Sequence, residues 1–489
     1  MLDPRLIRAE PARVRAGLAR RGAPADALDR ALELDAHWAA RDALAEALRL
    51  RRRRTSEEIA RTKTAPGTPP QDAAQGTDDL ERLGRQIAEE LRGARRDLAR
   101  LDAERRQALL LLPNLPATDV PEETAVLEET FLGPPPRASR VSGRMLRHRD
   151  LLSILGLAHT ADASAGRGFL LWREAGARLL RALAAFLLDV HARQFGYEEV
   201  RCPSVATREA LEGSAHLPAL EEKMYALSEP GAGLRRSSRD LGSRSGTRPP
   251  AKRAARTTQS SEAGSNGAMD SRGLEGGAAL FLIPRAEPHL ANLFRGQILD
   301  AGALPARFVA SGPAFRREAD HGGAAGRGLL RLHEFPTVEV YAFCRPQESE
   351  AELARAVEAA TKILALLEVP HRRLLRGARS LSHAAAKTID LEVWAGATER
   401  WLPVAALSSF TDYQARRTET RYRAADSKPR LVHTVGGAAV AIPHLVAALV
   451  ENGQEADGSV RLPESLRPYL GGLDHLRPPE PPDARTTKG

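Results

Sequence analysis

One stretch, PAFRREADHGGAAGRGLLRLHEFPTVEVYAF at residues 313–343, decides how the rest of the chain is read. It predicts a strand over residues 307–314, a glycine- and alanine-rich loop over 319–328 and a second strand over 329–343. Glycines on both sides of a bend between two β-rich segments are typical of an antiparallel hairpin with a long tip. We therefore expect two antiparallel strands side by side at this point of the fold.

One face of this hairpin carries side chains that suit a nucleotide. Residues two apart in a strand point to the same side. A guanidinium donates two parallel hydrogen bonds to a phosphate, an aromatic ring can stack on a base, and carboxylates accept hydrogen bonds from amines. The residues expected to share faces are Arg316 and Glu318 on the first strand, and Arg331, His333, Phe335, Thr337 and Glu339 on the second.

The residues FRxEA, followed by RGLxRxHxFxxVE, resemble the second signature motif of class II aminoacyl-tRNA synthetases, in its seryl-tRNA synthetase form. The resemblance extends from Met1 to about Gly472. It implies an α+β fold, in which an N-terminal antiparallel helical coiled-coil arm precedes a class II synthetase antiparallel β-sheet core flanked by helices. It also implies ATP-dependent activation of serine to seryl-adenylate and transfer of serine to tRNA, with ATP and Mg²⁺ as cofactors.

The resemblance gives each matched residue of the hairpin a role. It implies that Arg316 contacts the α-phosphate of ATP, that Glu318 meets the adenine amino group and that Phe335 stacks on the adenine. It implies further that Arg331 faces the ATP and that Glu339 faces the serine. The alternative is an exposed, charged hairpin without a ligand, which a single short motif leaves open.

Composition favours a multidomain protein from a reducing compartment. The chain has 489 residues, enough for two or three domains, and a net charge of +9, which suits either a polyanionic partner or solvated arginine-rich surfaces. Its two cysteines, Cys202 and Cys344, form neither a disulfide framework nor a zinc spacing. No apolar segment reaches about 18 residues, so we expect no membrane span. The N-terminus has no apolar signal region, so we expect no secretory signal. The expected location is the cytoplasm, with the mitochondrial matrix as the alternative.

Two long helices are expected near the N-terminus. The first covers residues 26–62 and ends in the basic run 51–54, residues 63–77 form a turn, and the second begins at Asp78. Two such helices predict an antiparallel coiled-coil arm, whose use is either oligomerisation or, by the resemblance, binding of tRNA phosphates through arginines. The apolar positions of the second helix step by threes and fours, as in a coiled coil: Leu80, Leu83, Ile87, Leu91, Ala94, Leu98 and Leu101.

Proline- and glycine-rich segments divide the chain. The arm ends at LPNLP, because proline cannot continue a helix. An insertion rich in glycine, serine, arginine and proline interrupts the second domain, and its composition predicts disorder. The alternatives for its role are loose affinity for RNA, a passive linker or a gene-model artefact. The expected units are the arm at 1–112, a connector at 113–165, a catalytic-type domain at 166–472 with the insertion at 230–279, and a disordered tail at 473–489.

A helix and a strand open the catalytic-type domain. Residues 196–200, GYEEV, and Pro203 follow one amphipathic helix, and together they resemble the first class II motif, which implies a homodimer interface. The alternative is an ordinary core helix and strand. The helix face is marked by Leu179, Leu183, Phe186, Leu187 and Val190.

Three positions expected to face serine depart from the family. Arg285 stands where the family has a threonine that meets the serine substrate. Gly436 and Ala438 stand where an asparagine and a hydroxyl residue help to frame it. We expect these changes to weaken recognition of serine.

The expected nucleotide side is altered too. Pro403 replaces a glutamate that helps to hold magnesium, and Ala405 and Ala406 replace small hydroxyl residues that follow it. His444 replaces an arginine that grips the γ-phosphate, and histidine is shorter and cannot form a bidentate clamp. We therefore expect weakened Mg²⁺ binding, with no metal ligand assigned to any residue.

These features support three hypotheses. The first is a working seryl-tRNA synthetase with a divergent pocket. The second is a catalytically impaired seryl-tRNA synthetase-like protein that keeps the fold, the tRNA arm and the dimer, with a non-enzymatic RNA- or protein-binding role. The third is a coiled-coil scaffold whose globular part is only a platform for partners.

Overall fold

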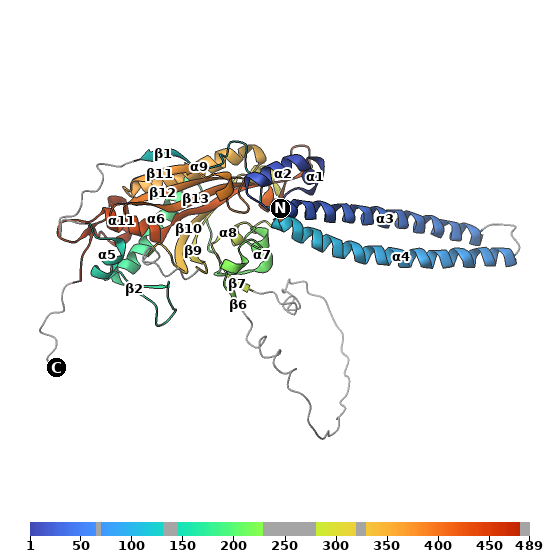
Figure 1. The fold of residues 1–489 in the computed structure, drawn as a ribbon, viewed down its shortest axis with the longest axis horizontal. Coiled ribbons are helices and arrows are strands. Elements are labelled where there is room, and N and C mark those ends of the chain that lie inside the picture. The colour runs from blue at the N-terminus through green and yellow to red at the C-terminus, as the bar shows by residue number, and fades with distance from the viewer. Residues whose placement is uncertain (65–69, 131–144, 228–279, 319–328, 480–489) are drawn as a thin grey trace, which may run out of the picture.

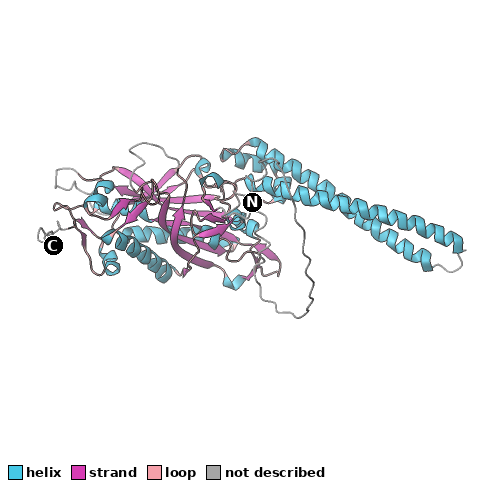
Figure 2. Cartoon of the chain, turned by 90° about the horizontal axis from the view of Figure 1, so that it is seen from below, coloured by secondary structure: helices cyan, strands magenta, loops and turns pink. Residues whose placement is uncertain are grey.

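The computed structural model describes residues 1–64, 70–130, 145–227, 280–318 and 329–479. A long helical arm projects from a body built around a sheet (Figures 1 and 2). The N-terminus lies where the arm meets the body (Figure 1). The predicted insertion at 230–279 and the last part of the predicted tail lie outside the described residues.

The arm consists of two long helices, α3 (Ala25–Thr64) and α4 (Pro70–Leu111), which lie side by side in both views (Figures 1 and 2). They have 40 and 42 residues, which corresponds to about 60 Å at 1.5 Å per residue. The expectation that residues 63–77 form a turn and that the second helix begins at Asp78 was wrong, since α4 begins at Pro70. Proline fits the first turn of a helix, where its missing N–H leaves no bond unmade.

The predicted apolar seam of α4 faces α3. Ile87, Leu91, Ala94 and Leu101 are buried, and Leu80, Leu83 and Leu98 are half-buried. Ile87 and Leu91 pack with Ala45 and Leu48 of α3 in one hydrophobic cluster. Since this cluster lies away from the body, the two helices stabilise each other by their own contacts.

The base of the arm is tied to the body by hydrogen bonds to the chain around the predicted proline boundary. The Asn114 side-chain amide donates to the carbonyl oxygens of Ala384 and Phe410, both at 2.9 Å. Tyr413 and Arg417 of α10 (Tyr413–Thr418) donate to the last carbonyls of the arm, those of Leu112 and Leu110. Two short helices, α1 (Pro4–Ala9) and α2 (Pro11–Arg20), cover this junction, and Val14 and Leu18 of α2 are buried.

The body is built on an eight-stranded sheet in the order β1-β11-β12-β13-β16-β10-β9-β4. Only β4 is parallel to its neighbour, and the other pairs are antiparallel. The predicted hairpin lies at β9 and β10, inside the sheet rather than at an edge. The strands are β1 (Ala125–Thr130), β4 (Glu198–Glu199), β9 (Ala306–Phe315), β10 (Glu334–Cys344), β11 (His371–Leu375), β12 (Lys387–Ala395), β13 (Arg400–Thr411) and β16 (His433–Ala441).

The two faces of the sheet bury different cores. On one face, Val338 and Val340 of β10 pack in the cluster that contains the buried sides of α6 (Glu174–Phe195), α9 (Ser349–Leu366) and α11 (Ile442–Asn452). On the other face, Tyr341 and Phe343 pack in the cluster that contains the base of the arm. Because side chains of a strand alternate between faces, the odd-numbered residues of β10 point away from the three helices.

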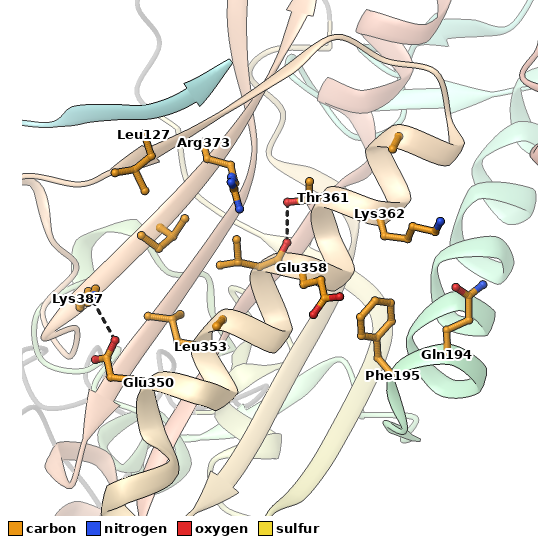
Figure 3. Close-up of a pocket in the computed structure, with 14 residues that line it drawn as sticks. Leu127, Gln194, Phe195, Glu350, Leu353, Glu358, Thr361, Lys362, Arg373 and Lys387 are labelled. Carbon is orange, nitrogen blue, oxygen red and sulfur yellow. Dashed lines mark hydrogen bonds and ion pairs between the residues drawn. The ribbon is translucent and has the colours of Figure 1, made fainter. Parts of the chain in front are cut away.

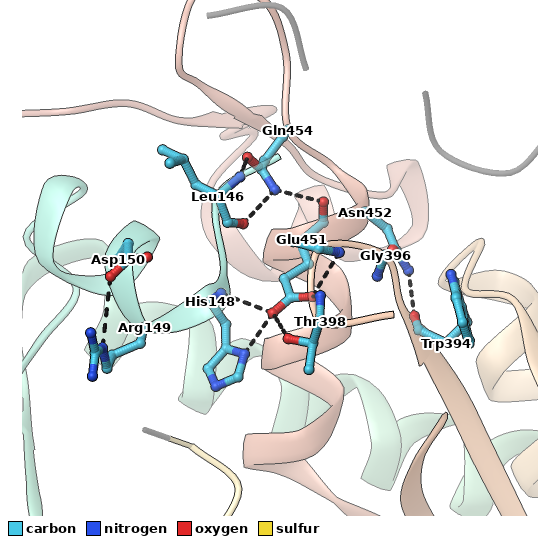
Figure 4. Close-up of polar contacts among 11 residues, drawn as sticks. Leu146, His148, Arg149, Asp150, Trp394, Gly396, Thr398, Glu451, Asn452 and Gln454 are labelled. Atoms are coloured by element: carbon cyan, nitrogen blue, oxygen red, sulfur yellow. Dashed lines mark hydrogen bonds and ion pairs between the residues drawn. The ribbon is translucent and has the colours of Figure 1, made fainter. Parts of the chain in front are cut away.

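The connector is more ordered than the sequence suggested. The connector predicted at 113–165 contains β1, α5 (His148–Ile154) and β2 (Ala158–Thr160), and β1 pairs with β11. The start of α5 is fixed to the end of α11 by Glu451, whose carboxylate accepts hydrogen bonds from the backbone N–H of His148 and Thr398 (Figure 4). The same carboxylate contacts Nδ1 of the His148 ring at 2.6 Å.

Smaller elements complete the body. Part of the expected disordered tail is regular, since His475–Leu476 forms β18 and pairs with β17 (Val460–Arg461). No helix in the described ranges has both the length and the apolar character needed to cross a membrane. The remaining elements are β3 (Leu170–Trp172), β5 (Val205–Thr207), α7 (Arg208–Gly213), β6 (Ala226–Leu227), β7 (Leu280–Leu282), α8 (Glu287–Leu290), β8 (Ile298–Asp300), β14 (Arg421–Arg423) and β15 (Pro429–Leu431).

Candidate active site

A pocket of about 420 Å³ lies over the β9–β10 hairpin and is closed by β13, β16 and the start of α11. It brings together residues from six separate parts of the sequence. Of the predicted site residues, all but Gly436 line it: Arg285, Arg316, Glu318, Arg331, Phe335, Glu339, Pro403, Ala438 and His444. Ala405 and Ala406 line it as well.

The register of β9 and β10 places three side chains of one strand in the pocket. Phe335 pairs with Ala314, and Glu339 pairs with Ala310. Phe335, Thr337 and Glu339 all line the pocket, as their spacing of two predicts. The small partners on β9 leave room above the strand for a ligand.

The second strand begins later than expected, at Glu334 rather than Leu329. His333 therefore does not share the face with Phe335 and does not line the pocket. Its ring stacks on Phe169 at a centroid distance of 5.3 Å, and its Nδ1 lies 2.7 Å from the Tyr225 hydroxyl. A β-carbon at Gly168 would lie 2.4 Å from this ring, so glycine is required there. His333 thus holds the segment of Gly168 and Phe169 against the hairpin.

The nucleotide side of the pocket contains two arginines, one paired with a carboxylate and one without such a partner among the described residues. Arg331 donates from Nε to Oε2 of Glu318 at 2.7 Å. Arg316 forms no ion pair with any described residue, and its backbone N–H is fixed by the carbonyl of His333 at 2.9 Å. Burial lowers the pKa of the Arg316 guanidinium, and the nearby Arg285 guanidinium adds to the effect. Arg316 is therefore a cation in need of a counter-ion, which a phosphate would supply.

The opposite side of the pocket contains two buried carboxylates. Oε2 of Glu339 accepts a hydrogen bond from the backbone N–H of Glu287 at 3.2 Å, and the Gln414 amide donates to Oε1 of Glu287 at 2.7 Å. Arg285 lies between them, with Nη1 3.4 Å from Oε2 of Glu287 and Nε 3.8 Å from Oε1 of Glu339. The two carboxylates thus form a site for a cation, and the guanidinium of Arg285 occupies that site.

Burial perturbs all three of these charged groups. It raises the pKa of Glu339 to about 7, although Arg285 opposes the shift, and it raises the pKa of Glu287. For Arg285 burial acts against the charged form, but the carboxylates of Glu339 and Glu287 outweigh it and raise the pKa of the guanidinium. Displaced pKa values of coupled groups in one pocket are typical of functional sites.

His444 closes the far wall. Its Nδ1 lies 2.6 Å from the carbonyl oxygen of Pro403, and its Nε2 lies 3.2 Å from the carbonyl oxygen of Leu330. The ring therefore links the start of α11 to β13 and to the return of the hairpin loop. This contact gives His444 a structural task in addition to any contact with a nucleotide.

Gly436 is the one predicted site residue that lies elsewhere. It sits in β16 opposite Tyr341, where an added β-carbon would lie 2.7 Å both from the Tyr341 ring and from the carbonyl oxygen of Val340. This corrects the expectation that Gly436 faces the amino acid. Its role is to let β16 approach β10.

The sequence reasoning missed several polar residues around the pocket. Glu287 was not assigned a role, although it is buried and contacts Arg285 and Glu339. Gln414 of α10 orients Glu287 by a hydrogen bond, and no conspicuous feature of the sequence pointed to this contact. Arg376 and Lys223 also line the pocket, and Arg376 forms a bidentate pair with Asp390. Glu287 is the first residue of the short helix α8, which follows the apolar strand β7, and this placement of a glutamate was the available signal.

The pocket offers little to a metal ion. Mg²⁺ prefers carboxylate and phosphate oxygens, but Glu318 is paired with Arg331, and Pro403 has no side-chain oxygen. Within the described ranges no group of three or more histidine, cysteine, aspartate or glutamate residues is placed to hold a metal. The residues present therefore do not form a protein-built magnesium site.

A second hollow, of about 750 Å³, lies between α9, the end of α6 and the edge strand β1 (Figure 3). Lys387 of this hollow is paired with Glu350 at 2.9 Å (Figure 3), and it is also paired with Asp119. Arg373, another lining residue, is paired with Glu128. We therefore place the active site in the smaller pocket.

Comparisons with known proteins agree with this geometry. Residues 1–116 match the seryl-tRNA synthetase N-terminal domain, and residues 274–453 match the tRNA synthetase class II core domain (G, H, P, S and T). A serine–tRNA ligase of Gemmatimonas aurantiaca is 38% identical over 484 residues, which cover 96% of this chain and 99% of the relative. The chain belongs to the seryl-tRNA synthetase family. A serine–tRNA ligase of Pelotomaculum thermopropionicum is 34% identical and covers 97% of this chain and 100% of the relative.

Solved structures of the seryl-tRNA synthetase family have the same architecture. The seryl-tRNA synthetase of Pyrococcus horikoshii, complexed with ATP, superposes with a TM-score of 0.78 at 27% identity and covers 98% of this chain and 100% of its own. The cytoplasmic serine–tRNA ligase of Naegleria fowleri, in complex with AMP, shares the fold with a TM-score of 0.73 at 21% identity over 96% of both chains. The predicted α+β fold, with a helical arm and an antiparallel sheet core, is confirmed. The relatives do not indicate the catalytically impaired alternative.

Proposed function

We propose that this chain is a serine–tRNA ligase that uses ATP. In the first step an oxygen of the serine carboxylate attacks the α-phosphorus of ATP, the bond to pyrophosphate breaks, and seryl-adenylate forms. In the second step a hydroxyl group at the 3′ end of tRNA attacks the seryl carbonyl carbon, and AMP leaves. Neither step requires a protein nucleophile, so catalysis depends on positioning and on stabilisation of charge.

The observation that carries this proposal is the shared pocket of Arg316, Phe335 and Glu339, which places a cation, a flat ring and a carboxylate on one side of the sheet. Binding of ATP is supported by the Pyrococcus horikoshii relative, which was solved with ATP. Arg316 takes the charge that develops on the α-phosphate. Phe335 stacks on the adenine, and Glu318 accepts a hydrogen bond from its amino group. Arg331 turns from Glu318 toward the phosphates when ATP enters.

The serine is held at the other end of the pocket. Its ammonium group pairs with the carboxylates of Glu339 and Glu287, which are the buried anions of this pocket. Ala438 lines the same end with a methyl group, so it supplies space and no hydrogen bond. Recognition of the serine side chain therefore depends mainly on the position of the ammonium and carboxylate groups.

Mg²⁺ belongs to this proposal as a companion of the ATP phosphates. The pocket does not itself supply a metal site, and we derive no step through the ion. The protein contribution to charge stabilisation then comes from Arg316 and Arg331. Mg²⁺ bound to nucleotide phosphates is usually also coordinated by one or two protein carboxylates. Because the pocket supplies no such metal site, we expect a weak apparent affinity for Mg²⁺.

The partners follow from the arm and the sheet edge. We propose that the arm binds tRNA through arginines such as those at 51–54, which are exposed on α3. Contacts of this kind position the phosphates without reading sequence. We propose a homodimer through α6 and the edge strand β4, as the first class II motif implies. The proposed location is the cytoplasm, with the mitochondrial matrix as the alternative.

The test is serylation of tRNA by the purified full-length protein. The chain is incubated with ATP, Mg²⁺, labelled serine at concentrations up to the tens of millimolar range, and a tRNA pool. We expect acid-precipitable serine that depends on ATP and tRNA, and a lower yield when the tRNA lacks its 3′-terminal adenosine. Protein that is folded by circular dichroism but transfers no serine would contradict the proposal.

A further inference from the structure

Arg285 occupies the place where an amino-acid ammonium group would pair with the protein. Its guanidinium lies between Glu287 and Glu339, at 3.4 Å and 3.8 Å from their nearest oxygens. The side chains of Glu339 and Glu287 are 1% and 6% exposed, whereas that of Arg285 is 24% exposed. The guanidinium is therefore the part that meets the open pocket, and the two carboxylates lie beneath it.

The guanidinium is held loosely compared with other arginines of this protein. Arg307 forms two hydrogen bonds of 2.7 Å to one carboxylate, that of Glu352. Arg285 forms no such fork, and its nearest carboxylate oxygens are long for charge-assisted bonds, which are usually about 2.7–2.9 Å. Replacing a cation that is held by two long contacts costs less interaction free energy than replacing one that is held by a bidentate pair.

The carboxylates themselves are fixed without Arg285. The backbone N–H of Glu287 holds Glu339, and the Gln414 amide holds Glu287. The Gln414 side-chain oxygen in turn accepts hydrogen bonds from Tyr341 and Thr434. The two carboxyl groups thus keep their positions when the guanidinium moves away, and an ammonium group that enters between them can take its place.

We propose that Arg285 is an internal competitor for the substrate ammonium group, and that it sets both the affinity for the amino acid and the discrimination against ligands that lack an ammonium. The inference rests on the proposed function, since it takes the ligand to be serine or its adenylate. When serine binds, Arg285 leaves the two carboxylates and turns into the open pocket. Binding of serine must therefore replace the guanidinium of Arg285 by the ammonium group, so the net gain in binding free energy from the ammonium is small.

The inference is tested with two non-hydrolysable adenylate analogues that differ only in the amino group. One is 5′-O-(N-seryl)sulfamoyl adenosine, and the other is its counterpart with hydrogen in place of the ammonium. Their dissociation constants are measured by calorimetry for the full-length protein and for the variants Arg285→Thr, Arg285→Gln and Arg285→Lys. AMP serves as the reference ligand for the nucleotide side, and the melting temperature of each variant reports folding.

We expect Arg285→Thr and Arg285→Gln to bind the seryl analogue about 10- to 100-fold more tightly than the native protein, the range of one charge-assisted hydrogen bond. Their affinity for AMP and for the analogue without the amino group should change less than about twofold. Arg285→Lys keeps a competing cation and should bind both analogues like the native protein.

Two results would overturn the inference. If the native protein prefers the seryl analogue to AMP and removal of Arg285 leaves that preference unchanged or weakens it, Arg285 does not compete with the ammonium. If neither the native protein nor any folded variant prefers the seryl analogue to AMP, the proposed function fails and the inference fails with it.

Discussion

Arg331 donates from Nε to Oε2 of Glu318 at 2.7 Å, so two residues expected to meet ATP hold each other in the ligand-free pocket. Arg316, two residues before Glu318, has no ion-pair partner among the described residues. The pocket thus presents one paired and one unpaired guanidinium to a nucleotide. Glu318 and Glu339 act on the charge of Arg316 but form no salt bridge with it. A phosphate can therefore pair with Arg316 without breaking an ion pair, and Arg316 should contribute most of the electrostatic stabilisation.

Substitution of Arg316 should therefore impair the chemical step. For Arg316→Ala we expect the rate of serine-dependent pyrophosphate exchange to fall about 100- to 1,000-fold, the usual effect of removing one group that stabilises developing charge. Arg316→Lys keeps the charge without the fork and should recover part of the rate. The adjacent Arg317 is exposed and does not line the pocket, so Arg317→Ala is the matched control. Equal losses at both positions would contradict this assignment.

The pH dependence of serine use should report Glu339. Burial raises the pKa of this carboxyl to about 7, Glu287 adds to the shift, and Arg285 and Arg316 oppose it. The ionised form pairs with an ammonium group, so kcat/KM for serine should be constant above the pKa and fall about tenfold per unit well below it. Glu339→Gln should show a low value without this limb. A flat profile down to pH 5.5 in the native protein would show that Glu339 does not bind the ammonium.

The buried Glu451 has a pKa shifted in the opposite direction from that of Glu339, and it predicts an effect on stability. Burial acts against its ionised form, but hydrogen bonds from His148 and Thr398 outweigh it and lower the pKa of Glu451 (Figure 4). A lowered pKa stabilises the fold above the ordinary value of 4.5, and this contribution is lost as the pH falls through the native pKa. We expect Glu451→Gln to cost about 3 kcal/mol at pH 7 and clearly less near pH 3.

Thermal unfolding of Glu451→Gln across this pH range checks the effect. Glu464 is exposed, and Glu464→Gln is the control that removes a carboxylate without removing buried hydrogen bonds. The prediction fails if both variants melt at the temperature of the native protein at pH 7.

The arm and the pocket should be separable by mutation. Ile87 is buried against α3, so Ile87→Asp places a charge in the seam and should loosen the arm. We expect the KM for tRNA in serylation to rise about tenfold or more, because the phosphate contacts lose their fixed positions, while pyrophosphate exchange stays unchanged. Gln86→Asp adds the same charge on the exposed side and should leave both reactions intact. Loss of exchange in Ile87→Asp would show that the arm also supports the pocket.

Much of this fold could be predicted because its main signals are local. The steps of three and four from Leu80 to Leu101 predict a coiled-coil seam, and the structure buries Ile87, Leu91 and Ala94 of this seam against α3. The alternation of Phe335, Thr337 and Glu339 predicts one face of a strand, and all three line the pocket. Boundaries were less predictable, as the first turn at Pro70 and the late start of β10 at Glu334 show.

Elements formed by distant contacts gave no local signal. The strand β1 exists because it pairs with β11, about 245 positions later in the sequence, as in the register of Glu128 with Arg373. The same holds for the carboxylate pair, which α8 and β10 bring together, and for its orientation by Gln414 from α10. Arg285 looked like a lost contact in the sequence, whereas the structure places it as a counter-ion.

Serine-dependent exchange of pyrophosphate into ATP tests the central claim most directly. The purified full-length protein is given ATP, Mg²⁺, labelled pyrophosphate and each of the twenty amino acids in turn, with serine tested up to the tens of millimolar range. The account predicts exchange with serine that exceeds the rate with every other amino acid and falls about 100- to 1,000-fold in Arg316→Ala. Folded protein that shows no exchange with serine, or equal exchange with threonine and alanine, would contradict it.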